Sequence, residues 1–238
     1  GQATEETVPA GAQRLIDAYP EQDLRYSRNS IIFPDGTSFI YDDEEQKDFT
    51  AKVDNPDIED MLSMEYEAKE KPDYMDDPGR MRCDAFFKKM YGNSSSKVYK
   101  KLVMVPWFGG EVSFTSVNGA AGQLAAVERE IRERYPDLVR YMECAGTFYW
   151  RKVDGTNRLS AHSFGIAIDI GVEYADYWRW SHKDAIETSG IAYANRIPME
   201  IVRVFEKHGF IWGGRWYHFD TMHFEYRPEM MQKDVPLF

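Results

Sequence analysis

The sequence predicts an α+β fold in which a small, mostly antiparallel sheet is flanked by helices. Amphipathic segments with helical spacing and short apolar segments typical of strands are both present, but they do not alternate regularly as parallel βαβ units require. Several strand segments are separated only by tight turns, such as the one at Asp35 and Gly36, which join antiparallel neighbours.

The N-terminal part is predicted to hold a tail, two helices and a hairpin. The tail covers 1–11 and a helix covers 12–19, where apolar residues recur at helical spacing. Apolar triplets on both sides of an Asp-Gly turn predict a hairpin over 30–41. Residues 57–67 return to helical spacing and predict a second helix.

The middle of the chain continues this mixture. A helix is predicted around Phe86 and Phe87, and the apolar segment 98–107 fits either a strand or an extended connector. Residues 120–135 form a long amphipathic pattern that predicts a helix, which ends where Pro136 follows.

The C-terminal part is predicted to contain three strands and two helical segments. Residues 166–170 are apolar and β-branched, which favours a strand, and the aromatic segment 174–180 favours a helix. The helix over 198–208 has Pro at its start and Gly just past its end. Short strands at 210–212 and 222–226 flank a Gly-Gly turn.

Composition limits the classes of function. The 238 residues are 43% hydrophobic and 15% aromatic, which is enough to form a buried core. With 29 basic and 40 acidic residues, the net charge of −11 argues against a nucleic-acid partner or an anionic membrane surface. No apolar run approaches the roughly 20 residues of a membrane-spanning helix. We therefore expect a globular protein with no transmembrane segment.

The two cysteines, Cys83 and Cys144, are too far apart in sequence for a CxxC metal or redox site. We favour two free thiols, and a single disulfide is the alternative if the protein is exported.

A histidine and an aspartate come together in the segment around the predicted strand 166–170. Alternation along that strand directs its three isoleucines to the core and Asp169 to the opposite face. His162 precedes Asp169 by seven positions, and a turn at Gly165 would bring its imidazole back over the carboxylate.

A second segment completes a metal-binding pattern. If His223 opens a strand, two imidazoles and the carboxylate of Asp169 give the three protein ligands of a catalytic zinc, with a fourth position open. Asp220 lies three residues before His223, where its carboxylate can reach a metal-bound water as a general base. His218 is an alternative ligand, whereas we expect His182 and His208 to lie at the surface or at a helix end.

The SxHxxGxAxD pattern at Ser160 to Asp169, together with DxMHFE at Asp220 to Glu225, resembles the zinc D-alanyl-D-alanine carboxypeptidases and related peptidoglycan peptidases of the M15 (VanY-like) family. The resemblance extends from about Pro106 to Pro228. It implies a Hedgehog/DD-peptidase-like fold with the zinc site on the sheet. Residues 106–238 would then be the catalytic domain, and residues 1–105 an N-terminal extension whose role is open.

The resemblance also implies roles for individual residues. His162, Asp169 and His223 match the ligands of one Zn²⁺ ion, and Asp220 matches the catalytic base, although many family members have Glu there. Arg151 matches the arginine that holds the substrate and the transition state. Beside this set, Ser160 and Glu225 are expected to orient the ligand imidazoles, Glu225 to be a backup base, and Trp216 to form a wall of the cleft.

The function implied is zinc-dependent hydrolysis of peptide bonds in peptidoglycan stem peptides, with the D-alanyl-D-alanine carboxypeptidase activity favoured. An L-alanyl-D-glutamate endopeptidase and a zinc-stabilised, non-catalytic binding module are the alternatives. A non-haem Fe(II) site is disfavoured, because those sites place the carboxylate two residues after the histidine. The substrate implies export to the periplasm or cell envelope. Because an acidic protein gains little attraction from anionic wall polymers, we also expect local positive charge in the cleft, from Arg151 and Arg158.

Overall fold

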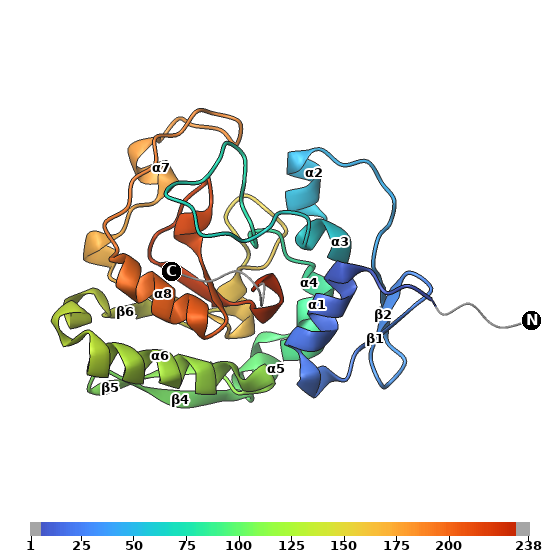
Figure 1. Ribbon diagram of the computed structural model, residues 1–238, viewed down its shortest axis with the longest axis horizontal. Helices are drawn as coiled ribbons and strands as arrows, with labels where there is room; N and C mark the ends of the chain where they lie inside the picture. The colour runs from blue at the N-terminus through green and yellow to red at the C-terminus, as the bar shows by residue number, and fades with distance from the viewer. Residues whose placement is uncertain (1–5, 232–238) are drawn as a thin grey trace, which may run out of the picture.

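The computed structural model describes residues 6–231, so the first five residues of the predicted tail lie outside it. It contains helices together with a three-stranded, a two-stranded and a four-stranded sheet, and each strand pairs antiparallel with its neighbours (Figure 1). The predicted α+β class is thereby confirmed. The likeness to Hedgehog and DD-peptidase folds stays a prediction. Within residues 6–231, no helix has the length and apolar character needed to cross a bilayer.

The helices and strands have the following bounds. The α-helices are α1 (Ala10–Ala18), α2 (Phe49–Asp54), α3 (Ile58–Met61), α4 (Asp84–Tyr91), α5 (Ser95–Tyr99), α6 (Ala120–Arg134), α7 (Trp178–Ser181) and α8 (Met199–Lys207). The strands are β1 (Arg25–Ser27), β2 (Ser30–Ile32), β3 (Ser38–Ile40), β4 (Leu102–Trp107), β5 (Gly110–Thr115), β6 (Cys144–Gly146), β7 (Ala167–Ile170), β8 (Phe210–Trp212) and β9 (His223–Tyr226). Two 3₁₀ turns matter below, η4 (Ala161–Phe164) and η6 (Gly213–Arg215).

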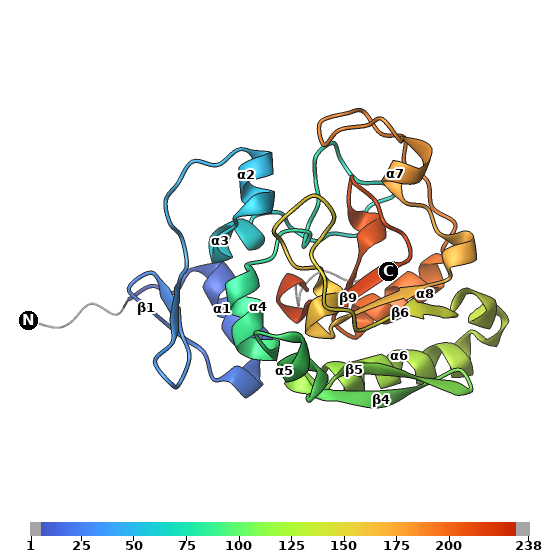
Figure 2. The same cartoon turned by 180° about the vertical axis from the view of Figure 1, so that it is seen from behind.

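The four-stranded sheet, in the order β6-β7-β9-β8, forms the centre of the molecule. Helix α8 packs against it, α6 packs against α8, and the β4-β5 hairpin lies along α6 (Figures 1 and 2). The Phe205 ring of α8 stacks on Phe224 of β9 with 3.9 Å between ring centroids. Ile168, Ile170 and Phe224 are fully buried in this layer. The apolar face of the sheet is therefore covered, and its other face is available for a site.

The segment before residue 106 shares a hydrophobic core with the central sheet. Leu15 of α1 and Phe86 of α4 are fully buried in the same cluster as Ile168. Residues 62–82 run across the C-terminal part of the chain, where the Trp216 indole donates to the carbonyl of Pro78 at 2.7 Å. The domain boundary expected near residue 105 stays a prediction.

Most of the predicted elements are present with small shifts at their ends. The helices predicted at 12–19, 120–135 and 198–208 are α1, α6 and α8, and the helix around Phe86 is α4. The hairpin at 30–41 is β2 and β3, and the strands at 166–170, 210–212 and 222–226 are β7, β8 and β9. The apolar segment 98–107 contains the end of α5 and then β4, so it is a strand only from Leu102 onward. Cys83 and Cys144 are both free, as we favoured.

Two predicted helices are much shorter than expected. The helix predicted at 57–67 ends at Met61, and the chain then turns inward so that the Tyr66 hydroxyl hydrogen-bonds Glu206 in the interior. The helix predicted at 174–180 is reduced to a 3₁₀ turn followed by the single turn α7. In both segments tertiary contacts of buried aromatic side chains override local propensity.

Several short elements were not predicted. Strand β5 follows β4 through a turn at Phe108 and Gly109, both with positive φ. Helix α5 precedes β4, and Ser94 caps it by accepting a hydrogen bond from the backbone N–H of Lys97. Strand β1 and helix α2 are too short to give a clear periodic pattern.

We expect Phe205→Ala to lower the free energy of unfolding by about 3 to 5 kcal/mol, because it removes a buried ring and leaves a cavity against the sheet. Urea denaturation followed by circular dichroism measures this change. Val172→Ala, at a side chain that is 55% exposed, is the control and should change stability by less than about 0.5 kcal/mol. A loss below about 1 kcal/mol for the Phe205 variant would contradict the packing described.

Candidate metal centre

The pairing of β7 with β9 places Asp169 directly opposite His223. Directly opposed residues of an antiparallel pair project from the same face of the sheet, so both side chains leave the face that α8 does not cover. The Asp169 Oδ1 lies 3.0 Å from Nδ1 of His223. The strand alternation predicted from the isoleucines thus directs the carboxylate away from the core.

His162 reaches the same point from the 3₁₀ turn η4. Gly165 ends that turn with φ at +71°, a left-handed conformation that favours glycine, and the chain then enters β7. Nε2 of His162 lies 3.1 Å from Oδ2 of Asp169. One donor atom from each of His162, Asp169 and His223 lies within 4.8 Å of the other two. The turn expected at Gly165 therefore exists and brings the three side chains together.

Hydrogen bonds on the outer side of each imidazole select its tautomer. Nδ1 of His162 lies 2.6 Å from the Thr147 carbonyl, which only accepts, so Nδ1 carries the proton and Nε2 offers its lone pair toward Asp169. Nε2 of His223 lies 2.8 Å from the Glu225 carboxylate, which accepts its N–H, and Nδ1 faces Asp169. Each imidazole therefore turns its inner nitrogen toward Asp169.

The two carboxylates beside His223 raise the pKa of its imidazole. Burial alone would lower the pKa of His223, but its hydrogen bonds to Asp169 and Glu225 outweigh burial and raise the pKa to about 10. Burial would also raise the pKa of Asp169, and the hydrogen bonds of both histidines instead lower it. Because a metal needs the unprotonated nitrogen, binding must displace a proton from His223.

Glu225 supports His223 through the hydrogen bond at Nε2 of the imidazole. It is fully buried and lies 3.1 Å from the Arg227 guanidinium and 3.3 Å from that of Arg82. Burial would raise its pKa, but Arg82, His223 and Arg227 lower it, so the carboxylate stays ionised. It lies on the far side of the imidazole from Asp169, which suits an orienting role but is not the position of a base beside the cavity.

Asp220 lines the same cavity as the three candidate ligands. Its backbone N–H donates to the Gly213 carbonyl at 3.0 Å, and a Cβ at Gly213 would lie 2.4 Å from the carbonyl oxygen of Asp220, so only glycine allows this approach. Its Oδ1 is buried without a hydrogen-bond partner within residues 6–231. Burial raises the pKa of Asp220 to about 6, against the opposing charge of His223. A buried, unsatisfied carboxylate oxygen next to the donor set suits a group that handles protons.

The cavity has a volume of about 700 Å³ and is lined by both polar and aromatic side chains. It is of the size that holds small-molecule or peptide ligands. Its lining includes the aromatic residues Tyr177, Trp178, Trp180 and Trp216 and five arginines, Arg80, Arg82, Arg151, Arg158 and Arg179. The local positive charge expected from Arg151 and Arg158 is therefore present.

The remaining predicted site residues occupy distinct places around the cavity. Arg151 lines it with an exposed side chain, while its backbone is tied to η4 through the Ser163 hydroxyl at 3.0 Å. Ser160 accepts from the backbone N–H of His162, so it holds the turn rather than the imidazole. Trp216 forms a wall, with its ring centroid 5.7 Å from that of His223.

His218 does not join the three candidate ligands. Its Nδ1 lies 2.6 Å from Asp77 and its Nε2 lies 2.6 Å from the Glu187 carbonyl, so both nitrogens are engaged. The alternative of His218 as a metal ligand is therefore wrong. Burial would raise the pKa of Asp77, but the hydrogen bond with His218 and the charge of Arg80 lower it.

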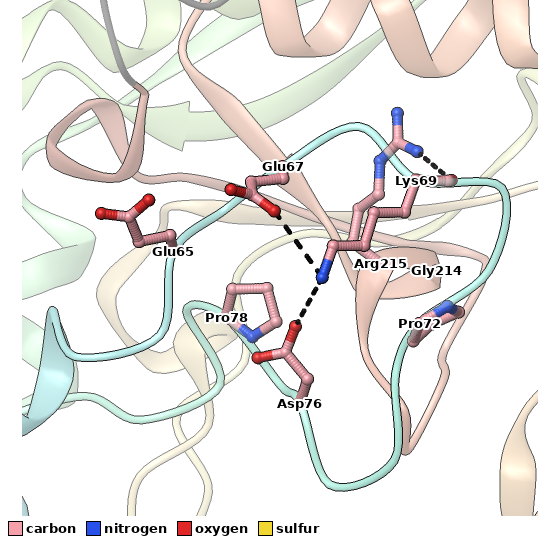
Figure 3. Close-up of a pocket in the computed structure, with 8 residues that line it drawn as sticks. All are labelled: Glu65, Glu67, Lys69, Pro72, Asp76, Pro78, Gly214 and Arg215. Atoms are coloured by element: carbon pink, nitrogen blue, oxygen red, sulfur yellow. Dashed lines mark hydrogen bonds and ion pairs between the residues drawn. The ribbon is translucent and has the colours of Figure 1, made fainter.

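A second, much smaller pocket lies apart from this site, with a cavity of only about 10 Å³ (Figure 3). In it the Lys69 ammonium lies 3.6 Å from Glu67 and 3.7 Å from Asp76, and Arg215 donates to the Lys69 carbonyl at 3.0 Å. The Arg215 hydrogen bond joins the segment 62–82 to η6, and the two Lys69 ion pairs lie within that segment. The pocket has room for about one water molecule, so it holds no substrate.

Residues 154–226 match the sequence model of the peptidase M15 family that is described as D-alanyl-D-alanine carboxypeptidase. The matched segment contains all three candidate ligands and Asp220 but begins after Arg151. No curated protein and no solved structure matches the chain. The resemblance to M15 peptidases is thereby confirmed over less than half of the chain.

Several residues of the site were not expected from the sequence. The Thr147 carbonyl, Arg82 and the Asp77–His218 pair carry no local pattern, because each contacts the site from a distant segment. The sequence predicts a turn at the Gly-Gly pair of η6, but it gives no sign that Gly213 packs closely against the backbone of Asp220.

We expect Glu225→Gln to weaken zinc affinity by about tenfold to a hundredfold, because the charge that orients and polarises His223 is lost while its shape is kept. Competition with a chromophoric chelator measures the affinity. Glu200→Gln on the exposed side of α8 is the control. Equal affinities for the two variants would remove Glu225 from the metal centre.

We expect Asp77→Asn to destabilise the fold by about 3 to 5 kcal/mol at pH 7, because it breaks a buried pair. The folded pKa of Asp77 lies below its ordinary value, so this stability is present in full above about pH 4 and is lost as pH falls through the folded pKa. Urea denaturation at several pH values checks both points. The exposed Asp184→Asn is the control, and a difference that grew in acid would contradict the assignment.

Proposed function

We propose that this chain, whose residues 154–226 match the M15 peptidase family model, is a zinc-dependent D-alanyl-D-alanine carboxypeptidase acting on peptidoglycan stem peptides. The observation that carries the proposal is the convergence of two imidazole nitrogens and one carboxylate beside the unpartnered carboxylate of Asp220. Action on wall peptides implies that the protein works in the periplasm or cell envelope.

The donor set fits zinc better than other common metals. Two nitrogens and one oxygen from His162, His223 and Asp169 form a typical catalytic zinc site, because three protein ligands leave one position open. Magnesium and calcium prefer sets made of oxygen alone. When bound, zinc supplies Lewis acidity that polarises a carbonyl and lowers the pKa of water to about 7.

The protein's own residues supply the proton transfers and the positive charge. Asp220, with its pKa raised to about 6, takes a proton from the attacking water and returns it to the leaving amine. A group with a pKa near the working pH performs both transfers efficiently. Arg151 lines the cavity and its charge acts on Asp220, which supports a role for its guanidinium in holding the developing oxyanion.

Incubation of the zinc-loaded protein with the pentapeptide L-Ala-γ-D-Glu-L-Lys-D-Ala-D-Ala should release one D-Ala, measured by mass spectrometry. A chelator should abolish the release, and added zinc should restore it. Fragments cut after L-Ala would instead identify the endopeptidase, and an untouched peptide would favour the binding module.

We expect Asp220→Asn to lower kcat by about a hundredfold to ten-thousandfold while leaving zinc affinity within about threefold, because it removes the base but no ligand. The control is Asp184→Asn, which lies on the exposed surface. Unchanged turnover in the Asp220 variant would remove that residue from the mechanism.

A further inference from the structure

One end of the cavity is lined by three arginines that come from two distant segments. Arg80 and Arg82 belong to the stretch before residue 106, and Arg158 belongs to the loop that precedes η4. The family match begins at residue 154, so Arg80 and Arg82 lie outside it. The charges of Arg80 and Arg82 act on Arg158, so the three guanidinium groups are close enough to influence one another.

The three arginines differ in how far their charge is already compensated. Arg80 donates to both oxygens of Glu187 at 2.8 and 2.9 Å and to Asp77 at 2.9 Å, so it is fully paired. Arg82 contacts Glu225 at 3.3 Å and donates to the Leu159 carbonyl at 3.1 Å. The Arg82 side chain is only 7% exposed, and its Nε is buried without a hydrogen-bond partner within residues 6–231.

Arg158 is compensated least. Its side chain is 13% exposed, and the part of the chain from 6 to 231 offers its guanidinium no hydrogen-bond acceptor. The Asp54 carboxylate lies 3.6 Å from Nε, too far for a hydrogen bond, and it is itself 58% exposed. Burial, reinforced by the charges of Arg80 and Arg82, lowers the pKa of Arg158 to about 10. A largely buried guanidinium without an acceptor is unfavourable unless a ligand supplies one.

We propose that Arg158, supported by Arg82, binds a carboxylate of the peptide substrate at this end of the cavity. The inference rests on the proposed function and extends it to a residue that selects the substrate. A planar guanidinium matches a carboxylate with two parallel hydrogen bonds, and a nearby second cation strengthens the attraction in a partly desolvated site. A stem peptide offers two sources for this group, its C-terminal carboxylate and the α-carboxylate of its γ-linked D-Glu.

Initial rates on three matched pentapeptides test the proposal with the full-length, zinc-loaded protein. The first is the free acid, the second has a C-terminal amide, and the third has D-isoglutamine in place of D-Glu. We expect Arg158→Gln to lower kcat/KM for the free acid by about tenfold to a hundredfold. The variant should also lose the wild-type preference for the free acid over one of the two amide peptides. The amide whose disadvantage disappears identifies the carboxylate that Arg158 binds.

Two further variants separate a specific contact from a general effect. Arg158→Lys keeps the charge but loses the planar fork, so it should recover part of the preference. Arg179→Gln also removes an arginine that lines the cavity, but Arg179 stacks on Trp178 at 4.3 Å, and this variant should keep the preference. Thermal unfolding of each variant shows whether it is folded. A folded Arg158→Gln protein that keeps the preferences of the wild type would overturn the proposal.

A binding measurement distinguishes failure of this subsite from failure of the proposed function. Trp178, Trp180 and Trp216 line the cavity, so their fluorescence reports binding of the dicarboxylate glutarate without any peptide cleavage. If glutarate binds the wild type but not Arg158→Gln while no peptide is cleaved, the subsite stands and the peptidase proposal fails. If peptides are cleaved but Arg158→Gln binds glutarate as tightly as the wild type does, the subsite is wrong and the peptidase proposal stands.

Discussion

The antiparallel pairing of β7 with β9 is the constraint on which the candidate metal centre depends. It sets Asp169 opposite His223, while alternation along β7 buries Ile168 and Ile170 on the other face. A register shift of one residue would turn the carboxylate into the apolar layer and expose isoleucines, so the hydrophobic core and the donor set specify the same register. The packing of α8 on the apolar face therefore also maintains the geometry of the site.

A chain of buried charges extends this constraint beyond the sheet. Glu225 holds His223, Arg227 pairs with both Glu225 and Glu229, and Glu229 accepts from the Tyr19 hydroxyl of the N-terminal segment. Arg227 also donates to the Gly79 carbonyl at 2.7 Å. Ions buried in this way are costly unless every partner is in place, so the network couples the N-terminal segment to the orientation of His223.

Net charge and local charge have opposite signs in this molecule. The chain carries −11, whereas the cavity lining has five arginines against four acidic residues, Asp154, Asp169, Glu187 and Asp220. Charges in a partly desolvated cavity act on a ligand through a lower effective dielectric than surface charges do, so the cavity lining governs which ligand is attracted.

The sequence by itself determined the fold class, the longer helices and the residue types of the donor set, because these depend on local periodicity and on a short motif in β7 and β9. It favoured His223 but left His218 as an alternative ligand, since both lie in the same aromatic segment and the contact of His218 with Asp77 comes from a distant part of the chain. Only the tertiary structure decided which groups hold the imidazoles and which arginines reach the cavity. The reason is physical: the Thr147 carbonyl has no side-chain signature, and Arg82 meets Glu225 across 143 positions of the sequence.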